Sequence, residues 1–451
     1  MSFPRYAGYT ESQLEYIGPI PSSWDLVPFF SRFIERKESN KGMKNDNLLS
    51  LSYGRIIPKD INSLDGLLPA SYETYQLVRP GDLVFRLTDL QNDKRSLRSA
   101  IVTGEGIITS AYLAVRPKAM NPAFASHLFR CYDQLKVFYS MGGGLRQSMK
   151  YDDMKWLPVV SPSLPEQTQI ARFLDHETAK IDALIAEQKR LIKLLQEKRQ
   201  AVISHAVTKG LDPNVPMKDS GVEWLGEVPA HWDIKSYKYA CRIYRGKFTH
   251  RPRNDPKMYD GQFPFIQTGD VARANKTIKT YSQTLNDKGA AVSQKFPSGT
   301  LVMAIAANIG DIATLGFEAY APDSVVGFKP NAGTNLEFLR YSLISALPAL
   351  QQASTQNTQA NLNVDRIGAL TTALPPTEEQ EKIVKHIEAQ LDGTSELISG
   401  ALETEKLLKE RRSATISAAV TGKIDVRNWQ LPADESGFDE DARKAGVEAS
   451  A

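Results

Sequence analysis

The sequence predicts an α+β protein with an internal duplication, in which two globular mixed α/β domains are separated by two long helices. Three observations lead to this fold class. Residues 166–208 recur as residues 379–421 at a constant offset of 213, and the first copy carries the apolar spacing of a long helix. The long segment that precedes each copy is rich in Gly, Pro and β-forming residues, which is typical of globular domains.

The duplication is clearest at the ends of the two predicted helices. LLQEKRQAVISHAVT at 194–208 aligns with LLKERRSATISAAVT at 407–421, and 11 of 16 paired positions from Lys193 and Lys406 onward are identical. Upstream, EYIGPIPSSWDL at 15–26 is echoed by EWLGEVPAHWDI at 223–234. The repeat therefore covers whole halves of the chain.

The first copy has two apolar stripes at sevens or multiples of seven, which predicts a helix that packs against another helix. Ser163-x-x-Glu166 and Thr377-x-x-Gln380 match capping boxes. Pro165 and Pro376 suit a first turn, and Gly210 and Gly422 suit the position after a last turn. The stripes consist of Ile170, Leu184 and Leu191, and of Leu174, Ile181, Leu195 and Val202.

A helix of about 43 residues is on the order of 60 Å long, and its natural partner is its own copy. The second copy is expected to be the poorer helix, because Gly393 and Gly400 interrupt it and Thr394 and Thr404 fall on its seam. A long helix of this kind is most often a spacer or a dimerisation element. Here the spacing itself is a candidate function.

Composition excludes several classes of protein. The formal charge is only +3, so a nucleic-acid surface must come from local patches. Cys131 and Cys241 lie far apart, and no two histidines have metal-ligand spacing, so neither a disulfide framework nor a metal site is indicated. The N-terminus lacks a signal pattern and no segment has the apolar length of a membrane span. A cytoplasmic protein is expected.

Within each half, the same order of elements is predicted. Residues 75–90 indicate a strand, a tight turn at Pro80-Gly81-Asp82 and a second strand, and residues 294–306 are their counterpart. Later strands are expected at 107–118 and 321–330, and short helices at 124–138 and 338–350. The acidic segment 425–451, which is low in apolar residues, predicts a disordered tail.

Candidate DNA-binding residues occur in cationic and amide-rich stretches of both halves. Forked cations and amides are the groups that hydrogen-bond base edges, and lysines suit phosphates. A charged stretch is also often just a solvated loop. In the first half the candidates are Arg86, Thr88, Gln91, Asn92, Lys94, Arg95, Arg98, Arg146 and Gln147. In the second half they are Arg245, Lys247, Arg251, Arg253, Gln267, Thr268, Asn308, Gln356 and Asn357.

Motifs for catalysis are missing from the sequence. Asn121-Pro122-Ala123-Phe124 lacks the second proline of an adenine methyltransferase motif and is expected to cap a helix. Glu35-Arg36-Lys37 has nuclease-like spacing but no identifiable supporting acid. No phosphate-binding glycine loop occurs. The sequence therefore predicts a binding protein and no catalytic residues.

With these motifs laid out, the chain resembles the DNA specificity subunit of type I restriction-modification systems. The resemblance extends to about residue 425 and depends on GVEWLGEVPAHWDI, PGDLVFRLTDLQNDKRSLR, GIITSAYLAVRP, PFIQTGDV, LPEQTQIARFLDHETAKIDALI and TEEQEKIVKHIEAQLD. The expected boundaries are 1–162 and 213–375 for target-recognition domains, 163–212 and 376–424 for spacer helices, and 425–451 for the tail.

This resemblance implies an antiparallel coiled coil with pseudo-twofold symmetry, which fixes the gap between two half-sites of an asymmetric DNA target. It also implies two methyltransferase subunits and translocating nuclease subunits as partners. This chain would direct the adenine methylation and restriction that those partners carry out in defence against phage. S-adenosylmethionine, ATP and Mg²⁺ would belong to those partners, with no cofactor in this chain. The alternatives are a coiled-coil scaffold or regulatory protein whose domains bind protein, and a DNA-modifying enzyme.

Overall fold

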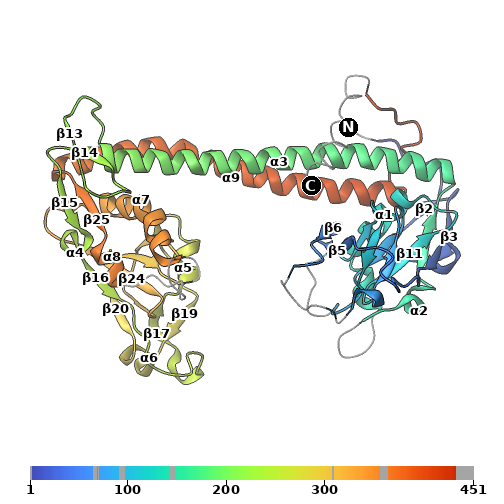
Figure 1. Ribbon diagram of the computed structural model, residues 1–451, viewed down its shortest axis with the longest axis horizontal. Helices are drawn as coiled ribbons and strands as arrows, with labels where there is room; N and C mark the ends of the chain where they lie inside the picture. Colours follow the sequence, from blue (N-terminus) through green and yellow to red (C-terminus); the bar gives the residue numbers. More distant parts are fainter. Residues whose placement is uncertain are drawn as a thin grey trace. The chain divides into compact units, whose positions relative to one another are not determined.

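The computed structural model describes residues 3–63, 69, 71–90, 97–141, 148–306, 309–355 and 364–432. The chain divides into two compact units (Figure 1). The first unit comprises Met1–Lys189 and Glu403–Ala451, and the second comprises Arg190–Leu402. Each unit therefore contains one globular domain and one part of each long helix.

The first unit has two four-stranded sheets, in the strand orders β6-β5-β10-β7 and β4-β11-β8-β9. Two small sheets, β1-β2 and β12-β3, join the domain to its long helix. The strands are β1 (Tyr9–Thr10), β2 (Ile20–Pro21), β3 (Asp25–Pro28), β4 (Phe33–Glu35), β5 (Leu48–Ser52), β6 (Arg55–Lys59), β7 (Gln76–Val78), β8 (Leu83–Phe85), β9 (Ser99–Ile101), β10 (Gly106–Ile108), β11 (Leu113–Pro117) and β12 (Pro158–Ser161). The helices are η1 (Phe29–Ser31), η2 (Tyr72–Thr74), α1 (Pro122–Gln134), η3 (Val137–Ser140), α2 (Tyr151–Met154) and α3 (Leu164–Lys209).

The second unit repeats these strand orders as β19-β17-β23-β20 and β16-β24-β21-β22, with β18 added at the edge. Its small sheets are β13-β14 and β15-β25. The strands are β13 (Met217–Asp219), β14 (Glu227–Pro229), β15 (Asp233–Ser236), β16 (Cys241–Arg245), β17 (Tyr259–Phe265), β18 (Thr277–Ile278), β19 (Gln283–Leu285), β20 (Gln294–Phe296), β21 (Leu301–Ala304), β22 (Ile312–Leu315), β23 (Ala319–Ala321), β24 (Val325–Pro330) and β25 (Thr371–Leu374). The helices are α4 (Tyr237–Ala240), η4 (Pro256–Met258), α5 (Thr268–Arg273), α6 (Asp287–Ala291), α7 (Leu336–Thr355), α8 (Val364–Ala369) and α9 (Thr377–Val420).

The alternation of side chains along β8 shows how each domain builds its core. Leu83 and Phe85 pack with α1 in the larger cluster, whereas Val84 packs between the two sheets. β21 does the same, because Leu301 and Met303 pack with α7 and Val302 lies between the sheets. An apolar layer on both faces of one strand explains its nearly continuous apolar sequence.

The turn at Pro80-Gly81-Asp82 joins two strands as predicted, but they do not pair with each other. β7 and β8 belong to different sheets, and so do β20 and β21 around Gly299. Gly81 and Gly299 have φ of +88° and +78°, a conformation that favours glycine. The predicted short helix at 124–138 ends earlier, at Gln134, and Asn121 caps it as expected by accepting from the amides of Ala123 and Phe124.

The long helices α3 and α9 contain 46 and 44 residues. Gly210 and Gly422 follow them with φ of +74° and +72°, as expected for C-terminal glycines. The prediction that Gly393 and Gly400 interrupt the second helix is wrong, because α9 is continuous through both. Neighbouring residues with good helix propensity outweigh two glycines on an exposed face.

The predicted capping boxes are replaced by tertiary contacts. The Glu166 carboxylate accepts from the Tyr6 hydroxyl at 2.8 Å and from the Trp24 indole at 3.0 Å. In the second unit, Glu379 accepts from the Trp232 indole at 3.1 Å. The repeated tryptophan motif therefore docks on the first turn of the repeated helix in each unit. The Gln380 side chain likewise accepts a hydrogen bond from the Asn335 amide and donates to the carbonyls of Gly333 and Pro375.

The predicted apolar stripes are buried only in part. Ile170, Leu174 and Ile181 are buried, but Leu184 and Leu191 are 45% and 41% exposed. Ile170 and Leu174 pack into the core of the first globular domain, so burial follows that contact and not an unbroken seven-residue repeat.

The two long helices contact each other within each unit. In the first unit, the Arg412 guanidinium pairs with Asp182 at 2.8 Å and Lys189 pairs with Glu405 at 3.9 Å. From the first pair to the second, the residue number rises in α3 and falls in α9. These two helix segments are therefore antiparallel. In the second unit, Ile203 and Val207 of α3 share a buried cluster with Ile383 and Ile387 of α9.

The start of the predicted disordered tail is ordered. The Asp425 amide donates to the Pro4 carbonyl at 2.8 Å, and Val426 is buried. Trp429 packs against Phe173 and His176 of α3. Residues 433–451 lie outside the described residues.

Candidate nucleic-acid interface

The polar edge of each domain begins where β4 or β16 ends. The strand register places Lys37 of the first unit and Arg245 of the second at equivalent positions, because Glu35 and Ile243 each oppose the matching residue of β11 or β24. Lys37 pairs with Glu35 at 2.7 Å, and this contact raises its pKa. Arg245 is exposed and has no ion-pair partner among the described residues.

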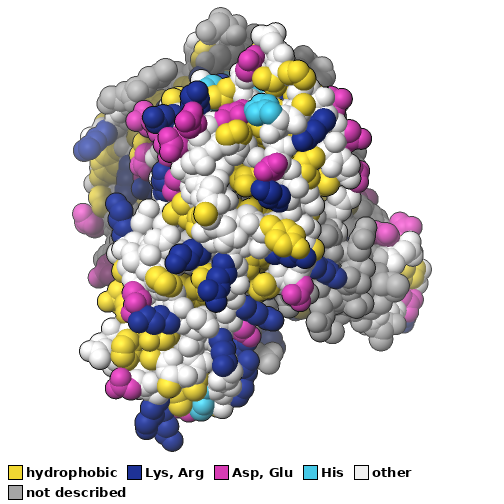
Figure 2. Space-filling view, turned by 90° about the vertical axis from the view of Figure 1, so that its left-hand side faces the viewer, with side chains coloured by type: hydrophobic (Ala, Val, Ile, Leu, Met, Phe, Trp, Pro, Cys, Tyr) yellow, Lys and Arg dark blue, Asp and Glu magenta, His cyan; other side chains and the backbone are white. Residues whose placement is uncertain are grey.

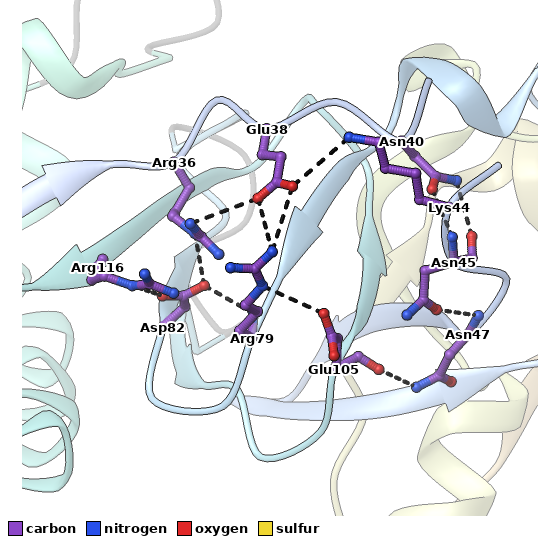
Figure 3. Close-up of polar contacts among 10 residues, drawn as sticks. All are labelled: Arg36, Glu38, Asn40, Lys44, Asn45, Asn47, Arg79, Asp82, Glu105 and Arg116. Carbon is purple, nitrogen blue, oxygen red and sulfur yellow. Dashed lines mark hydrogen bonds and ion pairs between the residues drawn. The ribbon is translucent and has the colours of Figure 1, made fainter. Parts of the chain in front are cut away.

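A buried carboxylate fixes this edge in the first unit (Figure 3). Asp82 is 1% exposed and accepts from the Arg36 side chain at 2.9 Å, the Arg116 side chain at 3.2 Å and the Arg79 amide at 2.9 Å. Glu38 pairs with Arg79 at 3.3 Å. These contacts join the segment after β4 to the turn before β8. Arg36 is therefore held internally, and the nuclease-like triplet has a structural explanation.

A pocket of about 480 Å³ lies beside this edge in the first unit. Its lining includes Lys37, Gln76, Thr88, Ser148 and Lys150, which come from four separate stretches of the chain. Of the predicted residues that the structure describes, only Thr88 lines this pocket. The structure thus brings Thr88, from the predicted DNA-binding stretch after β8, close to Ser148 and Lys150, which follow the predicted residues Arg146 and Gln147 in the sequence.

The loop after β16 carries the corresponding edge of the second unit. Arg251 donates to the carbonyls of Phe248 and His250, and Arg253 pairs with Asp323 at 2.7 Å. Lys247 is exposed and has no ion-pair partner among the described residues. The loop therefore uses two of its cations for its own shape and leaves Arg245 and Lys247 for a ligand.

One acidic side chain offsets the charge of this loop. Asp255 caps η4 by accepting from the Lys257 amide at 3.1 Å, and His250 contacts its other oxygen at 2.9 Å. These hydrogen bonds, the one from the Lys257 amide first, hold the pKa of Asp255 below its ordinary value. It is therefore anionic at neutral pH. Figure 2, which faces the side where β15, β16 and β20 lie in Figure 1, shows many Lys and Arg side chains over its middle and lower part.

Gln267 and Thr268 stand at the start of the short helix α5. The Gln267 amide donates to Asp270 at 2.8 Å, and its side chain contacts Gln283. Asp270 is 5% exposed and also accepts from Arg273 and Ser282. Buried Asp270 thus fixes the turn that exposes Gln267.

Arg98 does not have the place that the sequence suggested. It is 0% exposed, and its guanidinium donates to the backbone carbonyls of Thr88 and Asp89. A buried guanidinium that organises a loop in this way cannot reach DNA, so Arg98 is a structural residue. Arg86 is half-buried nearby. The remaining predicted residues lie outside the described residues, namely Gln91, Asn92, Lys94, Arg95, Arg146, Gln147, Asn308, Gln356 and Asn357.

Lys37 and Lys150 were not among the DNA-binding residues predicted from the sequence. The two cationic stretches that were predicted occupy different positions in the two repeats. Residues 86–98 follow β8, whereas residues 244–257 begin at the end of β16, the counterpart of β4, and continue beyond it. The sequences after β4 and β16 are too different to align by eye, and only the strand register relates them.

Among the described residues, no group of three or more His, Cys, Asp or Glu could hold a metal ion. No helix in the described part of the chain is long and apolar enough to cross a membrane.

A family model for the type I restriction modification DNA specificity domain matches residues 232–405. Over this segment the chain is similar to that family, which confirms the resemblance predicted from the sequence. A comparison with curated proteins finds no match.

A solved structure of a type I R-M system shares the fold over most of the chain. One chain, from a structure on complex assembly and conformational transition of the type I R-M system, has a TM-score of 0.65 and 17% identity over 89% of this chain and 98% of its own. The HsdS subunit from Thermoanaerobacter tengcongensis has a TM-score of 0.45 and 16% identity over 90% and 98%. The type I S subunit from M. genitalium has a TM-score of 0.36 and 12% identity over 91% and 98%.

Proposed function

We propose that this chain recognises a bipartite, asymmetric DNA target, with one half-site read by each unit. The observation that carries the proposal is the repeated strand order of the two domains combined with different side chains at equivalent edge positions. Lys37 is paired in one domain, whereas Arg245 and Lys247 are available in the other. An internal duplication with two different surfaces suits two different half-sites.

The base-reading residues in this proposal are Arg86, Gln91, Asn92 and Arg95 in one domain and Arg251, Arg253, Gln267 and Asn308 in the other. Arginine suits guanine edges, and amides suit adenine edges. The internal contacts of Arg251 and Arg253 mean that a base must compete with the Phe248 carbonyl and with Asp323 for them. Arg245 and Lys247 have no such competition and are suited to phosphates.

The long helices would fix the gap between the half-sites as an antiparallel coiled coil with pseudo-twofold symmetry. The opposed ion pairs in the first unit and the shared apolar cluster in the second support this proposal. Half-site separation then depends on helix length, in the same way that dimer spacing sets operator spacing.

Two methyltransferase subunits and translocating nuclease subunits are the partners in this proposal. Several leucines of α3 and α9 are exposed, which suits helices that bury further apolar surface against other proteins. They are Leu184, Leu191, Leu194, Leu397, Leu402 and Leu407. Adenine methylation and restriction, with S-adenosylmethionine, ATP and Mg²⁺, would then belong to the partners, and this chain would supply specificity without catalysis.

A genome-wide map of methylated adenines in the source cell, with the gene present and deleted, tests the proposal. We expect a split motif with a fixed gap to lose its methylation on deletion. Identical maps in a cell whose partner subunits are shown to be active would contradict the proposal. Purified protein whose binding to duplex DNA does not weaken with added salt would instead favour the alternative, a scaffold whose domains bind protein.

A further inference from the structure

A second cationic site lies in the first unit, away from the pocket beside β4. It is a cleft of about 530 Å³ between the β5–β6 turn, α1 and the adjoining segments of α3 and α9. Among the described residues, five Lys or Arg side chains and an exposed tyrosine line it, against one lining carboxylate, Asp182. These residues are Tyr53, Arg55, Arg130, Lys189, Lys409 and Arg412.

The β5–β6 turn is built to present two of these side chains. Tyr53 and Gly54 have φ of +45° and +74°, and the Arg130 side chain donates to the Gly54 carbonyl at 2.6 Å. A Cβ on Gly54 would lie 2.0 Å from the Arg130 guanidinium, so the contact requires glycine. The anchored turn leaves the Tyr53 ring 84% exposed and the Arg55 side chain 77% exposed at the mouth of the cleft.

The cations of the cleft outnumber the acids that face them. Asp182 forms an ion pair with Arg412 at 2.8 Å and lies 4.0 Å from Arg55. Glu405 forms ion pairs with Lys409 at 2.7 Å and with Lys189 at 3.9 Å. Two carboxylates are thus shared among four cations, and the cleft keeps a positive excess.

The pKa of buried Arg130 also reflects the excess of positive charge in the cleft. The pKa of Arg130 is lowered to about 10, first by burial and also by the nearby charges of Arg412 and Arg55, against the opposing effect of Asp133 and Asp182. The remaining titratable group that lines the cleft, His127, contacts Asp175 at 2.8 Å. An anion bound at the mouth would relieve the repulsion between these guanidinium groups.

We propose that this cleft binds backbone phosphates of duplex DNA beside the half-site that the first unit reads. The inference rests on the proposed function and adds a sequence-independent contact to it. Arg55 is 77% exposed and lies 4.0 Å from Asp182, so it can turn to a phosphate, whereas a phosphate must compete with Glu405 for Lys409. Tyr53 offers a hydroxyl and a ring to the adjoining sugar. Phosphate contacts of this kind position the protein but do not select bases.

The second unit has a smaller cleft of about 280 Å³ at the corresponding place, with less charge. At the repeat offset of 213, Gln196 replaces Lys409, while Arg199 replaces Arg412. Ile344 of α7 also lines this cleft, where Arg130 of α1 lines the first one. The backbone contact is therefore assigned to the first unit alone.

The double variant Arg55→Gln/Lys409→Gln in the full chain, with its methyltransferase partners, tests the proposal. Binding to a target duplex and to an unrelated duplex is measured over a series of salt concentrations. We expect the slope of log K against log salt to shrink by about 2, because each phosphate contact contributes about 0.9. Affinity should fall by a similar factor on both duplexes, and the methylated sequence should stay the same.

The control is Lys406→Gln/Arg411→Gln, which removes two exposed cations of α9 that do not line the cleft. Equal losses in both double variants, or an unchanged salt slope, would overturn the assignment. Tyr53→Ala gives an independent readout, since this exposed ring should weaken binding to both duplexes without lowering thermal stability. Loss of inorganic phosphate binding with no change on duplex DNA would assign the cleft to a small anion. Failure of the unchanged protein to prefer its target would instead contradict the proposed function.

Discussion

At the scale of single residues, two glutamates connect the globular domains to the long helices. Glu166 is 9% exposed and receives hydrogen bonds from Tyr6 and Trp24, and burial together with the Glu166 hydrogen bond raises the pKa of Tyr6. Glu379 holds Trp232 and His231 in the second unit, but its side chain is 28% exposed. The same repeated position thus makes a buried contact in one unit and a wetter one in the other.

We therefore expect Glu166→Ala to destabilise the first unit by about 1–3 kcal/mol, because two buried donors lose their acceptor. Glu166→Gln should recover part of this loss, since an amide oxygen can still accept. Glu379→Ala is the matched control and should cost less, because water can replace the carboxylate there. Urea unfolding followed by tryptophan fluorescence measures the loss in free energy of unfolding for each of the three variants. Equal losses at Glu166 and Glu379 would contradict the argument from burial.

Residue composition indicated where the cationic stretches lie but not which cations have internal partners. Arg253 pairs with Asp323, 70 positions away, and buried Arg98 donates to loop carbonyls. Such partners are set by tertiary contacts, which the local sequence does not contain. The equivalence of Lys37 and Arg245 depends on strand register and was hidden for the same reason.

At the scale of elements, the long helices were predictable and the sheets were not. Helix ends are encoded locally by Pro165, Gly210, Pro376 and Gly422, and α3 and α9 begin and end within a few residues of them. Strand partners are non-local, so nothing in residues 75–90 shows that β7 and β8 enter different sheets. The interruption expected at Gly393 failed because propensity is a weak term in a helix of 44 residues.

The glycines of α9 give a prediction at this scale. Gly393 and Gly400 are exposed helical positions, and a Cβ at either one would meet nothing within 4 Å. We expect Gly393→Ala and Gly400→Ala each to stabilise the protein by about 0.5–1 kcal/mol in urea unfolding. Gly422→Ala is the contrast, because its φ is +72° and its Cβ would lie 2.3 Å from Pro21. A loss of stability at Gly393 or Gly400 would mean that α9 needs their flexibility.

At the scale of the whole molecule, the proposed function assigns base reading to the two globular domains and the spacing to the two long helices. The domain edges differ between the units, whereas the helix termini and their tryptophan contacts are nearly the same. In the proposed function, base preference then belongs to each domain alone and the gap belongs to the helices. Changes in one should leave the other unaltered.

Lengthening both helices tests this separation directly. One helical turn inserted after Leu195 in α3, with an equal insertion after Ser399 in α9, adds about 6 Å to the helices. We expect the methylated motif to keep both half-sites and to gain about one or two base pairs in its gap, given the 3.4 Å rise of DNA. The same residues inserted between Asp212 and Pro213, beyond the end of α3, are the control and should leave the gap unchanged. Altered half-sites, or an unaltered gap, would show that the helices do not set the spacing, because helix length is all that the insertion changes.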